Sequence, residues 1–166
     1  MKLILPAIIV FLTAFFTIKK FLDNEQKKRL VNLRKDGQTV ITPIRLQAYE
    51  RVTMFLERIS PLALVNSVNK QGMSARMLQA GMLSTIRDEF NHNLSQQVYM
   101  SNEAWLLVKK SKEEMIKMIN VTLYKVGDSA SGSDLSKVIL QIAMKMDKLP
   151  TEIAIDFLKA ELRKLF

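Results

Sequence analysis

The chain has 166 residues, with 25 lysines and arginines against 16 acidic residues, and so a net charge of +9. This length fits one domain of ordinary size with an appendage rather than two domains. The chain contains no cysteine, which excludes disulfides and zinc–cysteine sites. Five glycines and four prolines provide little material for turns, which disfavours a fold built from many strands.

The N-terminal segment is an apolar run over residues 3–18 in which Thr13 and Thr17 are the only mildly polar members. Sixteen helical residues rise about 24 Å, and extension to residue 22 approaches the ~30 Å of a bilayer core. A cleaved signal peptide is the main alternative. No small-x-small cleavage site follows the run, however. The sequence therefore predicts an uncleaved transmembrane anchor over residues 1–22.

The basic residues near this anchor are distributed unevenly. Residues 1–36 carry eight of them against three acids, a surplus of five of the nine net charges. Only Lys2 precedes the apolar run. The residues that follow it, and that we expect at the membrane surface, include Lys19, Lys20, Lys27, Lys28 and Arg29. The positive-inside rule then predicts an outside N-terminus and a cytoplasmic C-terminal domain, while contact with anionic lipid head groups is an additional role for the cluster.

Residues 23–41 are predicted to form a basic juxtamembrane helix and linker that is stopped at Asp36-Gly37. Residues 42–166 are then expected to form a cytoplasmic helical bundle of about five helices, because every periodic segment has a spacing of 3.6 rather than 2. Predicted helix starts are Thr42-Pro43, Ser74, Ser101, Ser133 or Asp134, and Leu149-Pro150. Residues 61–71 are predicted to be a mixed connector with room for a helical turn, and residues 127–133 (GDSASGS) a flexible linker.

The apolar residues of these helices recur at helical spacing and predict the core. They are Ala48, Val52, Phe55, Leu56 and Ile59; Leu78, Met82, Ile86, Phe90 and Leu94; Val108, Met115, Ile119 and Thr122; Leu135, Val138, Ile139, Ile142 and Met146; and Ala154, Phe157, Leu158, Leu162 and Leu165. Methionine is frequent, at ten residues. Its positions favour core filling, with a pliable groove for a partner helix as the alternative.

Glu89 and His92 form a Glu-x-x-His pair, which is one part of the di-iron site of ferritin-like bundles. The chain has a single histidine, so one copy cannot supply the whole site. Two copies together would bring two such pairs. A metal- or cofactor-binding homo-oligomer is therefore an alternative function.

The segment Gly127–Ser133 has the glycine spacing of a phosphate-binding loop, but Ser133 stands where that motif needs lysine. A helix-capping linker is the better interpretation. Nucleic-acid binding is disfavoured, because aromatic residues do not alternate with the basic ones. The sequence contains no set of residues that would perform catalysis, and it predicts no cofactor.

Three stretches resemble a known family: residues 41–61 (ITPIRLQAYERVTMFLERISP), residues 86–115 and residues 149–166 (LPTEIAIDFLKAELRKLF). The family consists of short, functionally uncharacterised, single-pass membrane proteins of Bacteroidota. The resemblance implies a bacterial source and an inner-membrane address. It implies no activity and no functional residues.

These observations together predict a membrane-tethered helical interaction or scaffold module, an accessory subunit of a bacterial inner-membrane assembly. Alternatives are the two-chain metal site and an anionic-lipid surface sensor. The expected partners are the bilayer and either another protein or further copies of the chain, with no nucleic acid. Candidate interface residues are Arg45, Glu50, Arg51, Glu57, Asn91, His92 and Trp105.

Overall fold

The computed structural model describes the backbone of residues 4–165 and the side chains of residues 11–29, 39 and 41–164. Within this part of the chain there are six α-helices, one 3₁₀-helix and no strand. The prediction of an all-α protein is therefore confirmed. The Cα atoms group into two compact units, Met1–Pro43 and Ile44–Phe166.

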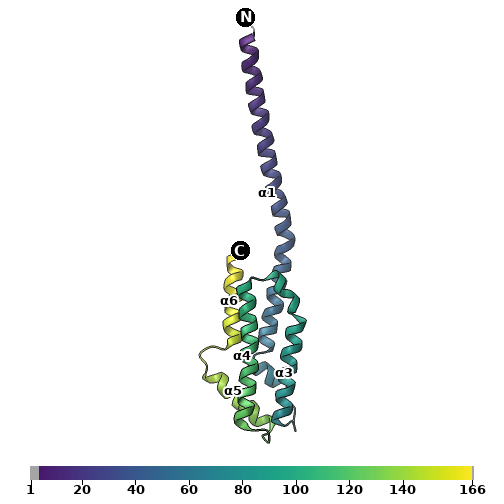
Figure 1. Cartoon of the computed structure of the whole chain (residues 1–166), viewed down its shortest axis with the longest axis vertical. Coiled ribbons are helices and arrows are strands. Elements are labelled where there is room, and N and C mark those ends of the chain that lie inside the picture. The colour runs from purple at the N-terminus through teal and green to yellow at the C-terminus, as the bar shows by residue number, and fades with distance from the viewer. Residues whose placement is uncertain (1–3, 166) are drawn as a thin grey trace. The chain divides into compact units, whose positions relative to one another are not determined.

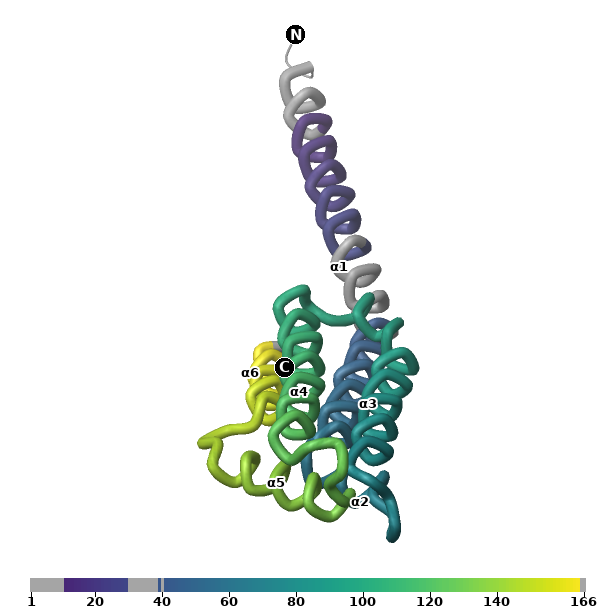
Figure 2. The backbone as a smooth tube through the Cα atoms, turned by 60° about the horizontal axis from the view of Figure 1, so that its bottom comes forward, coloured from purple at the N-terminus to yellow at the C-terminus, as the bar shows by residue number. Residues whose placement is uncertain are grey.

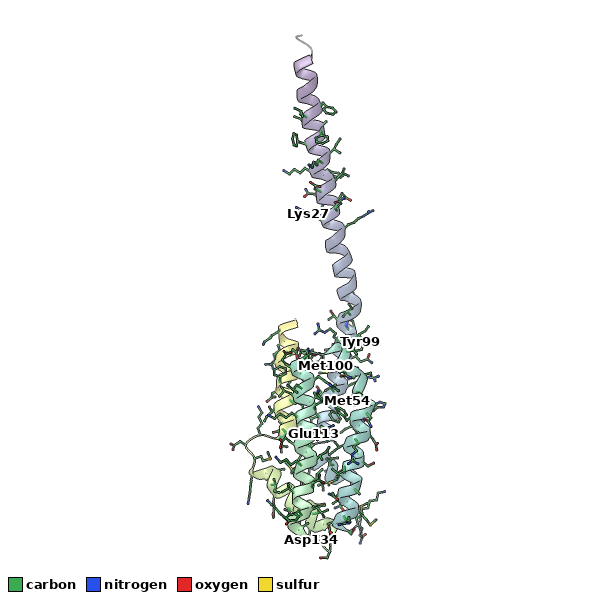
Figure 3. The ribbon with its side chains drawn as sticks, viewed as in Figure 1. Lys27, Met54, Tyr99, Met100, Glu113 and Asp134 are labelled. Carbon is green, nitrogen blue, oxygen red and sulfur yellow. The ribbon has the colours of Figure 1, made fainter. Side chains whose placement is uncertain are left out.

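The first unit is formed by the N-terminal part of helix α1 (Ile4–Arg58). All its described side chains from residue 11 to residue 29 are exposed (Figure 3). No helix in the described part of the chain is both long enough and apolar enough to cross a membrane. Eight of the sixteen residues in the apolar run, residues 3–10, lie outside the side chains that the structure describes. The spanning anchor therefore remains a proposal.

Helix α1 continues through both points where the sequence predicted a helix boundary. Its backbone is helical at Asp36-Gly37, and Pro43 lies inside it rather than at the start of a new helix. Glycine costs a helix about 1 kcal/mol and proline about 3 kcal/mol. Favourable neighbouring residues can outweigh penalties of this size. The two predicted helix boundaries were therefore wrong.

The second unit is a bundle whose long members are the C-terminal part of α1 and helices α3, α4 and α6. Helix α4 lies between α3 and α6, whereas α2 and α5 are short and lie at one end of the bundle (Figures 1 and 2). The remaining bounds are α2 Pro61–Val68, α3 Ala75–His92, η1 Leu94–Tyr99, α4 Asn102–Val126, α5 Gly132–Lys145 and α6 Pro150–Leu165. The predicted connector over residues 61–71 thus contains a helix of its own.

The core of this unit follows the predicted stripes. Buried as expected are Ala48, Val52, Phe55, Leu56, Ile59, Leu78, Met82, Ile86, Val108, Met115, Ile119, Thr122, Leu135, Ile139, Ala154 and Leu158. Exposed against expectation are Leu94, Met146 and Phe157. Leu94 is exposed because α3 ends at His92, so the helical stripe that predicted it does not extend that far.

Serine side chains begin three of the helices. The hydroxyls of Ser74 and Ser101 accept backbone N–H groups at the starts of α3 and α4, as predicted. Helix α5, however, is capped by Ser131 rather than by Ser133 or Asp134. The Ser131 hydroxyl accepts the Asp134 N–H at 3.1 Å, and the Asp134 carboxylate accepts the Ser131 N–H at 3.2 Å.

The predicted flexible linker over residues 127–133 forms backbone hydrogen bonds with the start of α3. Its Ala130 carbonyl accepts the Ala75 N–H at 2.9 Å, and the Gly132 N–H donates to the Met73 carbonyl at 2.8 Å. These two bonds join the starts of α3 and α5. Gly127 closes α4 with a φ of +85°, a conformation that is accessible to glycine at little cost.

Candidate functional site

A polar surface cavity of about 290 Å³ lies between α1 and the C-terminal end of α3. Met54, in the cavity lining, lies between Tyr99 and Asp134 along the bundle and nearer to Tyr99 (Figure 3). The lining consists of Gln47, Glu50, Arg51, Met54, Phe55 and Arg58 from α1 with Glu89, His92 and Asn93. Three of the predicted interface residues, Glu50, Arg51 and His92, therefore lie in one cavity.

One side of the cavity is held together by Arg58 and Glu89. The Arg58 Nη1 donates to both carboxylate oxygens of Glu89, at 2.9 and 3.1 Å. Asn93 is buried, and its Nδ2 donates to the Glu89 carbonyl at 2.8 Å. Beneath them, the rings of Phe55 and Phe90 pack with centroids 5.9 Å apart. The ion pair and the Phe55–Phe90 contact join α1 to α3 at this side of the cavity.

The other charged groups of the cavity have no such partner. Glu50 and Arg51 are exposed, and neither forms an ion pair with another described residue. His92 is exposed beside them. An unpaired carboxylate and an unpaired guanidinium on one helix offer hydrogen bonds and charge to another molecule.

The other candidate interface residues lie elsewhere. Arg45 is half-buried, and its Nε donates to the Tyr99 carbonyl at 3.3 Å. Glu57 is exposed but faces a second groove, and Asn91 is exposed outside the cavity lining. The structure thus brings together only part of the predicted set.

Trp105 does not lie on the surface, and the expectation that it does was wrong. Its side chain is buried and stacks on Phe90, with ring centroids 5.5 Å apart and planes at 23°. The Lys112 ammonium lies 4.3 Å from the Phe90 ring centroid. Trp105 shares a helix face with Val108, one turn away, so the periodicity of α4 places it in the core.

No three histidine or acidic side chains are placed to hold a metal ion within the described residues. Glu89, the predicted ligand, is bound to Arg58 instead, and that ion pair would have to open before a metal could bind. The site built from two chains stays a prediction. It requires about one equivalent of iron, manganese or zinc per dimer of the purified chain.

A second polar pair is buried between α1 and α6. The Tyr49 hydroxyl and the Glu161 Oε2 are both buried, and neither reaches a hydrogen-bond partner in the described structure. Burial, and then the negative charge of Glu161, raise the pKa of Tyr49 above its usual value of 10.0. This pair is closed to solvent, so it is unsuited to binding a partner.

Sequence reasoning missed Arg58 and Met54, which also line the cavity. Helical spacing offered a signal for both. Arg58 lies seven positions after Arg51, and Met54 four positions after Glu50, so all four residues share one side of the helix. Neither residue type by itself marks a site.

The comparisons with known proteins identify the family. No curated protein and no solved structure matches the chain. The sequence profile of one family matches residues 1–165, and the family's description is "Family of unknown function (DUF7935)". The chain therefore belongs to DUF7935, a family of unknown function.

Proposed function

We propose that this chain is a membrane-tethered helical interaction module, with the N-terminal part of α1 in the bilayer and the bundle as its docking domain. The setting proposed is a bacterial inner membrane, in which the chain is an accessory subunit of a larger assembly. The N-terminus lies outside and the bundle in the cytoplasm.

The observation that carries the proposal is the exposed apolar surface of α1 before residue 23. Its large side chains are Phe11, Leu12, Phe15, Phe16, Ile18, Phe21 and Leu22, each between 45% and 68% exposed. Exposed apolar surface of this extent is rare on soluble proteins and indicates contact with lipid or protein. The Thr17 hydroxyl donates to the Thr13 carbonyl at 2.6 Å, so this polar group is satisfied by its own helix, as a lipid environment requires.

The cations that follow this surface support the same arrangement. Lys19, Lys20, Lys27, Lys28 and Arg29 are all exposed. Each basic residue beside an anionic leaflet contributes about 1 kcal/mol of attraction. These side chains would therefore strengthen the tether as well as orient it.

The docking role is supported by the polar cavity on α1 and α3. Glu50 and Arg51 expose charges on α1 that no described residue pairs, and charged groups of this kind determine which partner is accepted more than how tightly it binds.

The tether is tested by alkaline carbonate extraction of membranes from cells that express the full chain. The chain is expected to stay in the pellet. Replacing Phe15 and Phe16 with lysine is expected to release it, because two charges near the bilayer centre oppose insertion. A wild-type chain found in the supernatant would mean that a protein, not lipid, covers the apolar surface.

The docking site is tested by affinity purification in mild detergent followed by mass spectrometry. A stoichiometric partner is expected, and Glu50→Arg with Arg51→Glu should abolish its recovery. The control is Arg87→Glu with Asp88→Arg, which inverts an exposed pair on α3 outside the cavity. If the partner is still recovered with Glu50→Arg and Arg51→Glu, the docking site lies outside the cavity.

A further inference from the structure

A second, apolar groove of about 460 Å³ lies on the bundle, where the end of α1 and start of α2 meet the end of α5 and start of α6. Leu62, Leu140, Ala143, Met144 and Leu149 line it. Its volume is within the range of about 300–1,000 Å³ that is usual for small-molecule pockets. It shares no lining residue with the polar cavity.

Two large apolar side chains of this groove are turned toward solvent. Met144 is 82% exposed and Leu62 is 59% exposed. Methionine is flexible and polarisable, and it adapts to the shape of an incoming apolar side chain. The sequence left open a pliable groove for a partner helix, and Met144 is the methionine among the residues that line this one.

The charge of the groove is opposite in sign to that of the chain. Both charged residues in its lining, Glu57 and Glu152, are acidic, whereas the chain as a whole carries +9. The Glu152 Oε2 accepts the Leu149 N–H at 2.9 Å at the start of α6. Glu57 is exposed and forms no ion pair with a described residue.

We propose that this groove binds an amphipathic helix of a partner protein that places apolar side chains against Leu62 and Met144 and a lysine or arginine against Glu57. The charge complementarity selects a basic partner, and the apolar lining selects a helix with one apolar face. The inference rests on the proposed function in one respect, that the bundle is a docking domain. It adds the chemical class of the partner.

The test uses the full chain in lipid nanodiscs, because detergent would compete for an apolar groove. The probe is a fluorescent 16-residue helical peptide with leucines at i, i+4, i+7 and i+11 and lysines on both flanks. Its twin carries glutamates in place of the lysines. Fluorescence anisotropy is expected to show at least about tenfold tighter binding of the basic peptide.

Variants locate the binding on the protein. Met144→Glu and Leu62→Glu should each weaken binding of the basic peptide at least about tenfold, and Glu57→Lys should shift the preference toward the acidic twin. Both apolar residues are exposed, so the bundle should keep its fold, and circular dichroism checks this. The control is Met77→Glu, because Met77 is 58% exposed on α3 and lies outside the groove.

Equal binding of the two peptides, or binding that survives Met144→Glu, would overturn the proposal. A third outcome also overturns it: no peptide binds, and Met144→Glu instead abolishes cross-linking between copies of the chain, so that a second copy covers the groove. Because affinity purification with the Glu50 and Arg51 variants tests the docking role and carbonate extraction tests the tether, failure here leaves both parts of the proposed function standing.

Discussion

At the scale of single residues, the start of α5 is stabilised by reciprocal hydrogen bonds between Ser131 and Asp134. We expect Ser131→Ala to lower the free energy of unfolding by about 1 kcal/mol, the usual cost of removing a serine cap. Ser133→Ala should have little effect, because Ser133 lies inside the helix and does not cap it. Urea unfolding of the full chain measures both variants. An equal loss for the two would mean that Ser131 is not the cap.

Tyr49 makes folding sensitive to alkaline pH. Its pKa is raised in the folded bundle, mainly by burial, so the folded state keeps the hydroxyl protonated where the unfolded chain ionises. The stability that this contributes is complete below pH 10 and is lost as pH rises from about 10 through the raised pKa.

Replacing Tyr49 with phenylalanine tests this dependence. Below pH 9 the substitution should be neutral or stabilising, because it removes a buried hydroxyl that has no hydrogen-bond partner. Above pH 10 the variant should lose less stability than the wild type. Tyr124→Phe is the control, since Tyr124 is 91% exposed. Parallel alkaline melting curves for wild type and Tyr49→Phe would contradict the prediction.

At the scale of elements, α2 and α3 pack so closely at Gly81 that the contact leaves too little space for a side chain there. A Cβ added at Gly81 would lie 2.6 Å from a methyl carbon of Val68. Alanine gains about 1 kcal/mol of helix propensity over glycine, but overpacking of this kind costs about 1–3 kcal/mol. Gly81→Ala should therefore destabilise the bundle by about 1 kcal/mol on balance.

The same substitution should change sign when Val68 is shortened. In a Val68→Ala background the methyl group is gone, and Gly81→Ala should then stabilise the protein. Thermal unfolding of the four proteins in this double-mutant cycle gives the coupling energy. A Gly81→Ala effect that is identical in both backgrounds would show that α2 and α3 are not in contact at this point.

The helices themselves could largely be predicted from sequence, because core periodicity and serine caps are local signals. The stripe on α1 from Ala48 to Ile59 and the caps at Ser74 and Ser101 are confirmed. The helix boundaries at Gly37 and Pro43 were not predictable, since a helix tolerates single unfavourable residues when its neighbours compensate. The Ser131 cap was missed because three serines lie close together and tertiary pairing with Met73 and Ala75 selects among them.

The candidate site was predictable only in part. Glu50, Arg51 and His92 were chosen as surface residues and do share a cavity. That these residues meet depends on how α1 packs against α3. The same packing forms the ion pair between Arg58 and Glu89, the predicted metal ligand. Trp105 shows the opposite case, because it was chosen as a surface residue although its helical spacing with Val108 indicates the core.

At the scale of the whole molecule, the core and the apolar N-terminal surface belong to different parts of the chain. Every buried residue in the described structure lies between Ala48 and Leu158. Residues 1–36 hold five of the nine net positive charges, so the bundle alone is only moderately basic. Stability and membrane attachment are therefore expected to be separable.

A fragment of residues 41–166 tests this separation. It retains every described buried residue and is long enough to form a core without disulfides or metals. It should be helical by circular dichroism and should unfold cooperatively, within a few degrees of the bundle transition of the full chain. It should also leave the membrane pellet, because the exposed apolar surface of residues 11–22 is gone. A fragment without a cooperative transition would mean that the N-terminal residues contribute to the core. A folded fragment that still pellets with membranes would locate a lipid contact on the bundle itself, and the apolar groove at Leu62 and Met144 would be the first surface to examine.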